Sequence, residues 1–175
     1  MEPFETIALG ATRESALWGA ALLPREKRQL LPVFSPLGEA GFAVGLESIY
    51  EGYLLHYGRP RLFAPADRDT AVLLGDYLYA HGLVRIAAVG EVEVVADLAE
   101  LLSVCAQLRA EGRPGDGAAW AATVASLGGP GGALERARTA LREGGDPQRL
   151  LALAGAKAGS NALGRALALH STRVD

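Results

Sequence analysis

The 175-residue sequence contains a single cysteine, Cys105, and few aromatic residues. One cysteine cannot form an intramolecular disulfide, and its place in an apolar helical run predicts a buried structural thiol. Aromatic residues make up only 6% of the chain and hydrophobic residues 50%, so leucine, valine and alanine must build most of the core. Such a core favours helices over strands.

The sequence has no region in which charge of one sign dominates. Its 17 Lys and Arg residues are scattered among 20 acidic residues, for a net charge of −3. This balance disfavours binding to nucleic acid or to an anionic membrane surface. The N-terminal residues MEPFETIALG lack the basic region and long apolar stretch of a secretion signal, and the apolar runs are too short or interrupted to span a bilayer. We therefore expect a soluble, cytoplasmic protein with one domain over residues 1–175.

Apolar residues recur at helical spacing, and capping signals divide the chain into about seven helices. We expect an all-α orthogonal bundle centred on the helix over residues 70–89, because apolar residues cover nearly its whole circumference. Asp67 or Asp69 is the expected N-cap of this helix. Valines at the start of residues 90–112 also suit a strand, but the length and the leucine spacing favour a helix. The other helices are expected over residues 12–23, with a short continuation through 24–31, and over 35–57, 118–127, 133–145 and 147–170.

Asp76 is the first candidate for a functional side chain, because its helical neighbours are apolar and should bury its carboxylate. A buried carboxylate must find a hydrogen-bond donor or raise its pKa. It would then serve as an acid, a base or a ligand anchor or, in the interpretation we favour, as a structural hydrogen-bond hub. Tyr77, His81 and Arg85 form the least apolar strip of the same helix. That strip suits either a cleft or subunit contact or, more simply, a partly exposed polar edge.

Glu47 and Glu51 lie four residues apart, so both carboxylates share one side of a helix. With a third ligand they would suit a divalent cation. The simpler interpretation is a solvated face, opposite the stripe of apolar residues that runs from Phe42 to Tyr57 on the same helix. The three histidines, His56, His81 and His170, have no metal-ligand spacing. The GGPGG segment lacks the lysine and hydroxyl of a phosphate-binding loop. The sequence thus predicts no catalytic residue and no metal site.

Two segments carry a resemblance to a known family. Residues 71–112, AVLLGDYLYAHGLVRIAAVGEVEVVADLAELLSVCAQLRAEG, contain a Gly-Asp-Tyr-Leu element, and residues 47–56 read ESIYEGYLLH. They resemble the polyprenyl diphosphate synthases, in which a helix ending in Leu-Ile-His precedes an aspartate-rich motif and an alanine-rich Gly-Asp helix follows it. The resemblance covers about a third of the chain. It implies an isoprenoid-synthase-like helical bundle, shortened relative to the catalytic members.

The chain departs from this family at its metal-binding residues. Tyr57, Gly58 and Arg59 stand where the family places its paired aspartates, and no second aspartate-rich motif follows downstream. Those carboxylates hold the Mg²⁺ that neutralises the diphosphate of the substrate. Arg59 and Arg61 match the diphosphate-binding arginines of the family.

The resemblance therefore implies a non-catalytic subunit, similar to the small component of heptaprenyl diphosphate synthase, that pairs with a catalytic subunit in isoprenoid or quinone side-chain synthesis. Such a subunit holds no cofactor and meets Mg²⁺ only through its catalytic partner. Two alternatives are a homodimeric helical module that binds an isoprenoid or another apolar ligand, and a small enzyme that uses Asp76 and His81. The expected ligand or partner contacts are Asp76, Tyr77, His81, Arg85, Arg59 and Arg61.

Overall fold

The computed structural model describes residues 3–90 and 92–174, and this part of the chain forms nine α-helices and no β-strand. The all-α class predicted from the sequence is thus confirmed, with more helices than expected. Three 3₁₀ turns, over Arg25–Lys27, Ser35–Leu37 and Ala40–Phe42, precede the third helix. The helices are α1 (Pro3–Glu14), α2 (Ala16–Ala21), α3 (Ala43–Tyr57), α4 (Arg68–Ala87), α5 (Val92–Ala110), α6 (Asp116–Ser126), α7 (Gly132–Gly144), α8 (Gln148–Ala158) and α9 (Ser160–Val174).

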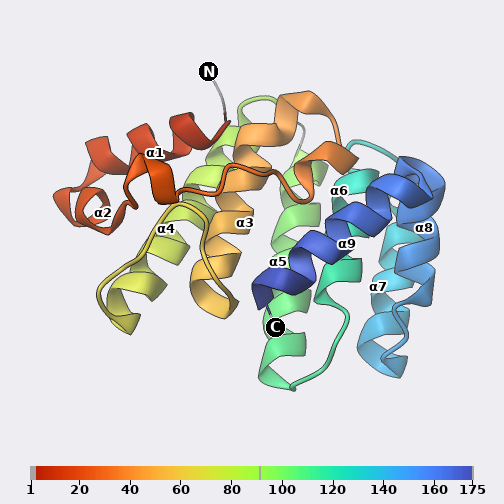
Figure 1. Ribbon diagram of the computed structural model, residues 1–175. Helices are drawn as coiled ribbons and strands as arrows, with labels where there is room; N and C mark the ends of the chain where they lie inside the picture. The colour runs from red at the N-terminus through yellow and green to blue at the C-terminus, as the bar shows by residue number, and fades with distance from the viewer. Residues whose placement is uncertain (1–2, 91, 175) are drawn as a thin grey trace.

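The helices are arranged with α1 and α2 at one end of the molecule and α7 and α8 at the other (Figure 1). Between these ends α3 packs against α4, and α6 packs against α5, α8 and α9. In Figure 1, α9 is drawn in dark blue and crosses the front of the molecule. A large hydrophobic cluster surrounds α3, α5 and α6, and a smaller one joins α1 and α2 to α3 and α4.

The centre of the bundle is formed by α3 and α6, so the prediction of a central helix over residues 70–89 is wrong. Residues 45 to 55 of α3 are all buried, and α6 is buried along nearly its whole length. Only one side of α4 is buried, and Leu73 and Val84 on its other side are 56% and 67% exposed. Because α4 lies at the edge of the bundle, the described chain does not cover the whole of its apolar circumference.

Glycines let α3 and α4 approach each other until their backbones nearly touch. A Cβ atom at Gly82 would lie 2.4 Å from Ile49 Cγ1 and 2.8 Å from the carbonyl oxygen of Gly45. Farther along the contact, a Cβ atom at Gly75 would lie 2.6 Å from His56 Nε2. No larger side chain fits at these positions without displacing its neighbours. The two segments that resemble one family are therefore direct neighbours in the fold.

The N-terminal third is less regular than the sequence predicts. Thr12, expected near the start of a helix, lies inside α1, where its hydroxyl donates to Ala8 O (2.9 Å). Ser15 instead caps α2 by accepting a hydrogen bond from Leu17 N (3.1 Å). In place of the predicted short helix, residues 24–31 contain only the 3₁₀ turn over Arg25–Lys27. The side-chain cap of Ser15 thus fixes a helix boundary that apolar spacing does not reveal.

Later boundaries agree better with the sequence. Asp67 is confirmed as the N-cap of α4, since its side chain accepts from Thr70 N (2.7 Å), and the helix over residues 90–112 is confirmed as α5. The predicted helix over residues 147–170 is instead two helices, α8 and α9. Gly159 separates them, because it has a φ of +85° that only glycine adopts readily.

Candidate functional site

Two carboxylates of α3, Glu47 and Glu51, are buried and bind the side chain of Arg61. Arg61 Nη1 donates to Glu47 Oε2 (2.6 Å), and Arg61 Nε donates to Glu51 Oε2 (3.0 Å). Ser35 Oγ donates to the other oxygen of Glu47. The backbone N–H groups of residues 61 and 62 donate to Glu51 Oε1 at 2.8 and 2.7 Å. Each carboxylate oxygen thus accepts a hydrogen bond, as buried charges require.

The segment that follows α3 places Arg61 in this position. Residues 58–66, GRPRLFAPA, run back along α3, and Leu23 N donates to Leu62 O (2.9 Å) on the other side of the segment. The guanidinium carbon of Arg61 lies 5.0 Å from the ring centre of Tyr50. Burial alone would lower the pKa of Arg61, but the two carboxylates outweigh burial and raise that pKa. Arg61 is therefore charged throughout the working range of pH.

The prediction that Glu47 and Glu51 form a solvated face is wrong, because the two residues are 1% and 0% exposed. The segment over 58–66 and the turn at Ser35 cover this side of α3, and both carboxylates are bound to the guanidinium of Arg61. Arg61 is itself 0% exposed, so its predicted contact with a diphosphate or a partner is also wrong. The sequence offered one signal, an arginine placed among prolines and large apolar residues in a loop.

A second polar network joins α3, α5, α6 and α9 around Asp116. Tyr53 OH and Arg109 Nη2 both donate to Asp116 Oδ2, and Arg109 Nε lies 2.9 Å from Tyr53 OH. His170 Nε2 lies 3.3 Å from Asp116 Oδ2, and its Nδ1 lies 2.9 Å from Tyr50 OH. Burial alone would raise the pKa of Asp116, but the hydrogen bonds with His170 and Tyr53 and the nearby guanidinium hold that pKa well below its usual value.

The Asp116 network contains the groups of a proton relay but lies in the interior. The side chains of His170 and Asp116 are 5% and 13% exposed, and burial raises the pKa values of Tyr50 and Tyr53 well above their usual value. Its members bond to one another, and none of them is a serine or cysteine nucleophile. We therefore assign the network a structural role. Sequence reasoning missed it because its members come from four helices and lie up to 120 residues apart.

Asp76 lies on the open side of α4 with its side chain 64% exposed, so the prediction of a buried carboxylate is wrong. Its apolar helical neighbours suggested burial, but that side of α4 is not covered by the described chain. Asp76 Oδ1 lies 3.1 Å from His56 Nε2. Burial lowers the pKa of His56, and the carboxylate of Asp76 offsets part of that effect. Asp76 is thus an exposed carboxylate beside a largely buried histidine.

Tyr77, His81 and Arg85 form a half-buried strip on the side of α4 that faces α1 and α2. The ring centre of Tyr77 lies 4.2 Å from that of His81 and 5.8 Å from that of Trp18. A Cβ atom at Gly10 of α1 would lie 3.6 Å from Arg85 Nη2. The partly exposed polar edge expected at these positions is confirmed. Their contact with a partner stays a prediction.

The end of α3, where the resemblance expects paired aspartates, lies against the last turn of α9. Arg59 N donates to Arg173 O (2.9 Å), and the exposed guanidinium of Arg59 donates to Thr172 O. A Cβ atom at Gly58 would lie only 2.7 Å from Arg173 O. In residues 3–90 and 92–174, no three His, Cys, Asp or Glu side chains are grouped to hold a metal ion. The tight contact with α9 therefore occupies this position.

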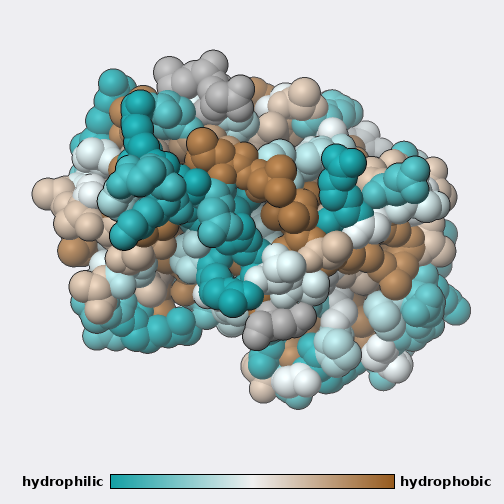
Figure 2. Space-filling model, in the orientation of Figure 1, coloured by the Kyte–Doolittle hydropathy of each residue, from teal (hydrophilic) through white to brown (hydrophobic). Residues whose placement is uncertain are grey.

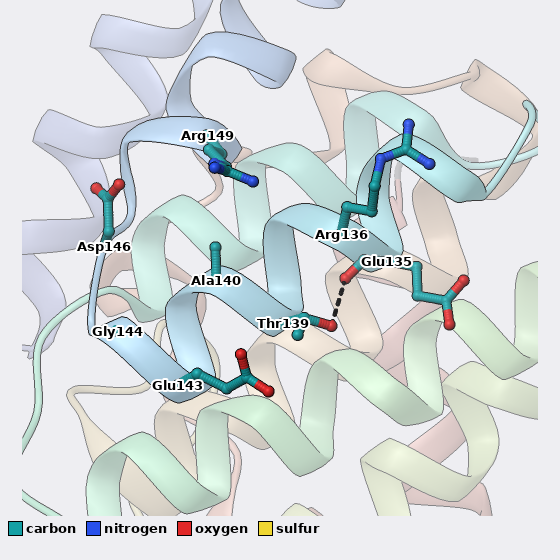
Figure 3. Close-up of a pocket in the computed structure, with 8 residues that line it drawn as sticks. All are labelled: Glu135, Arg136, Thr139, Ala140, Glu143, Gly144, Asp146 and Arg149. Carbon is teal, nitrogen blue, oxygen red and sulfur yellow. Dashed lines mark hydrogen bonds between the residues drawn. The ribbon is translucent and has the colours of Figure 1, made fainter.

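A hollow of about 770 Å³ opens beside α7 and the first turn of α8 (Figure 3). In Figure 3 its charged side chains point apart and do not converge on one point. The hydrogen bond drawn there joins Thr139 Oγ1 to the carbonyl oxygen of Glu135 (3.1 Å). A surface with both charges and no convergent groups does not select a ligand, and we assign it no site. Its charged lining residues are Glu135, Arg136, Glu143, Asp146 and Arg149.

The outer sides of α4 and α5 form an exposed apolar surface, which we name the α4–α5 face. On α5 one stripe of exposed positions, spaced alternately by four and three residues from Val92 to Ala110, carries no charge, while Glu93 and Gln107 are exposed outside this stripe. A helix side that faces water usually carries charged residues. The face consists of Leu73, Ala80, Val84 and Ala87 of α4 and Val92, Ala96, Ala99, Ser103, Ala106 and Ala110 of α5.

No protein family, characterised protein or solved structure matches the chain. The resemblance of residues 47–56 and 71–112 to the polyprenyl diphosphate synthases therefore stays a prediction. Within the part of the chain that the structure describes, no helix combines the length and the apolar character needed to cross a membrane.

Proposed function

We propose that this chain is a non-catalytic auxiliary subunit of a heteromeric prenyl diphosphate synthase, acting in isoprenoid or quinone side-chain synthesis. The observation that carries the proposal is the α4–α5 face. It lies on α4 and α5, which contain the longer of the two segments that resemble the family, and it exposes aliphatic side chains on α4 and an uncharged stripe on α5. Contiguous apolar surface with few charges at its centre is typical of protein interfaces.

The carboxylates of α3 support a role without catalysis. Prenyl transfer needs acidic side chains that hold Mg²⁺ against a diphosphate. In the segment ESIYEGYLLH both glutamates are bound to Arg61 in the interior, and the next three residues include no acid. Under the proposal, Mg²⁺ and both diphosphate substrates bind to the catalytic partner, and this chain contributes no catalytic residue.

Charge at the edge of the α4–α5 face favours a different chain over a second copy as the partner. Asp69 and Asp76 are exposed on the same open side of α4 as the aliphatic residues of the face, and Glu93 is exposed on α5. A homodimer formed through this face would bring acidic edges together, whereas a partner with lysine or arginine around its own apolar patch would neutralise them. We therefore favour the heteromer over the homodimeric module.

The proposal is tested by reconstitution. The purified chain is assayed with Mg²⁺, isopentenyl diphosphate and an allylic diphosphate, alone and after mixing with a DDxxD-bearing synthase subunit from the native organism. Product should form only in the mixture, or with a changed chain length relative to the partner alone, and the two chains should elute together in size-exclusion chromatography. Turnover by the chain alone would contradict the proposal, as would a stable monomer that leaves the partner unchanged.

Matched variants locate the contact. Ala106→Glu places a charge in the uncharged stripe of α5 and should abolish coelution, because a buried charge at an interface is costly. Ala152→Glu makes the same change at an exposed position of α8, outside the face, and should bind like the unaltered chain. Equal binding by both variants would exclude the α4–α5 face as the contact.

A further inference from the structure

A groove of about 260 Å³ lies between the segment that precedes α3 and the N-terminal half of α9. Its floor is formed by the buried side chains of Val33, Leu37 and Ala166, and Leu31 at its rim is 53% exposed. Figure 2 shows hydrophobic side chains gathered across the middle of this side of the molecule. None of these residues belongs to the α4–α5 face. The groove therefore offers a separate apolar surface that the proposed partner contact does not use.

The charge of this groove is positive. Arg165 lies at its rim, is exposed, and has no ion pair or hydrogen bond to another described residue. Asn161 stands one helical turn earlier and adds amide donors on the same side of α9. No aspartate or glutamate lines the groove. An apolar floor with one free guanidinium at its edge matches a ligand with an aliphatic tail and an anionic head.

We propose that this groove binds an amphiphilic anion. The tail of the ligand covers Leu31, Val33 and Leu37, and its carboxylate or phosphate accepts hydrogen bonds from Arg165. The volume lies just below the range of about 300–1,000 Å³ that is usual for small-molecule pockets, which suits a tail of medium length. Removing the exposed leucine from water supplies affinity, and the guanidinium supplies selectivity for the anion. This inference does not depend on the proposed partner subunit.

The test uses four ligands that share one tail and differ in the head group. The purified full chain is titrated by isothermal calorimetry with decanoate, decyl phosphate, decanol and decyltrimethylammonium, each below its micelle-forming concentration. At least one of the two anions should bind about tenfold or more tightly than decanol, the gain expected for one charge-assisted hydrogen bond, and the cation should bind most weakly. The difference between the two anions then tells a carboxylate ligand from a phosphate ligand. Anions that bind no better than decanol would overturn the proposal.

Two variants and a control place the ligand in the groove. Arg165→Gln should weaken the binding of the tighter-binding anion by about tenfold and leave the binding of decanol unchanged. Ala162→Trp fills the groove and should weaken the binding of every ligand. The matched control is Arg149→Gln, which removes an exposed arginine of α8 that does not line the groove and should change nothing. If Arg165→Gln and Arg149→Gln bind the anion equally well, the groove is not the site.

Discussion

Glu47 and Arg61 form an ion pair in the core, with 2.6 Å between Glu47 Oε2 and Arg61 Nη1 and almost no exposure of either side chain. Glu51 adds a second carboxylate to the same guanidinium. Such a group is stable only while each charge keeps its partner, because an unpaired charge in the interior costs several kcal/mol. The pairing also holds the segment over 58–66 along α3. It thereby positions the end of α3, where the resemblance expects paired aspartates and the chain has none.

Replacing Arg61 should destabilise the fold strongly. Arg61→Met keeps much of the volume and removes the positive charge, which leaves Glu47 and Glu51 buried without a counterion. The free energy of unfolding should fall by about 3–5 kcal/mol, measured by urea denaturation at neutral pH. Arg25→Met is the matched control, since Arg25 pairs with Glu5 at the surface with a side chain 79% exposed. That variant should lose less than about 1 kcal/mol, and a similar loss in both would mean that the buried pairs carry no special stability.

The close contact of α3 with α4 predicts opposite effects for two glycine-to-alanine changes. Gly82→Ala improves helix propensity by about 1 kcal/mol, but its methyl group would overlap Ile49, so the net effect should be a loss of about 1–3 kcal/mol. Gly164→Ala lies within α9 with no neighbouring atom within 4 Å of the added Cβ, so the free energy of unfolding should rise by up to about 1 kcal/mol. Thermal unfolding followed by circular dichroism compares the two, and stabilisation by Gly82→Ala would contradict the packing described for α3 and α4.

Much of the fold follows from local sequence, but its burial pattern does not. Helical spacing and capping signals are properties of short windows, and they located α5 and the start of α4, where Asp67 or Asp69 was the expected cap and Asp67 is the observed one. Burial depends on what packs against a helix from elsewhere in the chain. The apolar circumference of α4 therefore suggested a central helix, whereas the two glutamates of α3 suggested a solvated face. Both assignments reverse because the segment over 58–66 covers α3 and no described segment covers the outside of α4.

The candidate site, like the fold, follows only in part from local sequence. The polar strip at Tyr77, His81 and Arg85 follows from helical spacing alone, and the structure keeps it on one side of α4. The Asp116 network could not be found in this way, because its aspartate stands after a glycine-rich connector and its partners come from three other helices. Only tertiary packing brings those groups together.

Asp76→Asn should lower the pKa of His56 further. Burial already lowers that pKa, and the carboxylate 3.1 Å away offsets part of the effect, so removing its charge leaves burial less opposed. When a histidine has a lower pKa in the native state than in the unfolded state, the fold loses stability as the pH falls through the unfolded pKa of about 6.5. The variant should lose more stability than the unaltered chain in this range. Proton NMR titration of the histidine ring gives the pKa directly. Asp69→Asn, on the same helix, should leave it unchanged, and an equal shift in both variants would mean that the His56 contact is not responsible.

Asp116 should make the fold sensitive to acid. Its native pKa is held well below the unfolded value of about 3.9, so the unfolded chain binds more protons near pH 3 and stability falls as the pH drops through that range. Urea denaturation at pH 6 and pH 3 should show that the unaltered chain loses at least about 1 kcal/mol more than Asp116→Asn, which has no carboxyl group to protonate at this position. Asp116→Asn should itself be less stable at pH 6, because Arg109 loses its counterion. Asp146→Asn, an exposed change outside the network, should keep the full acid sensitivity; if it and Asp116→Asn behave alike, the network does not set the response to acid.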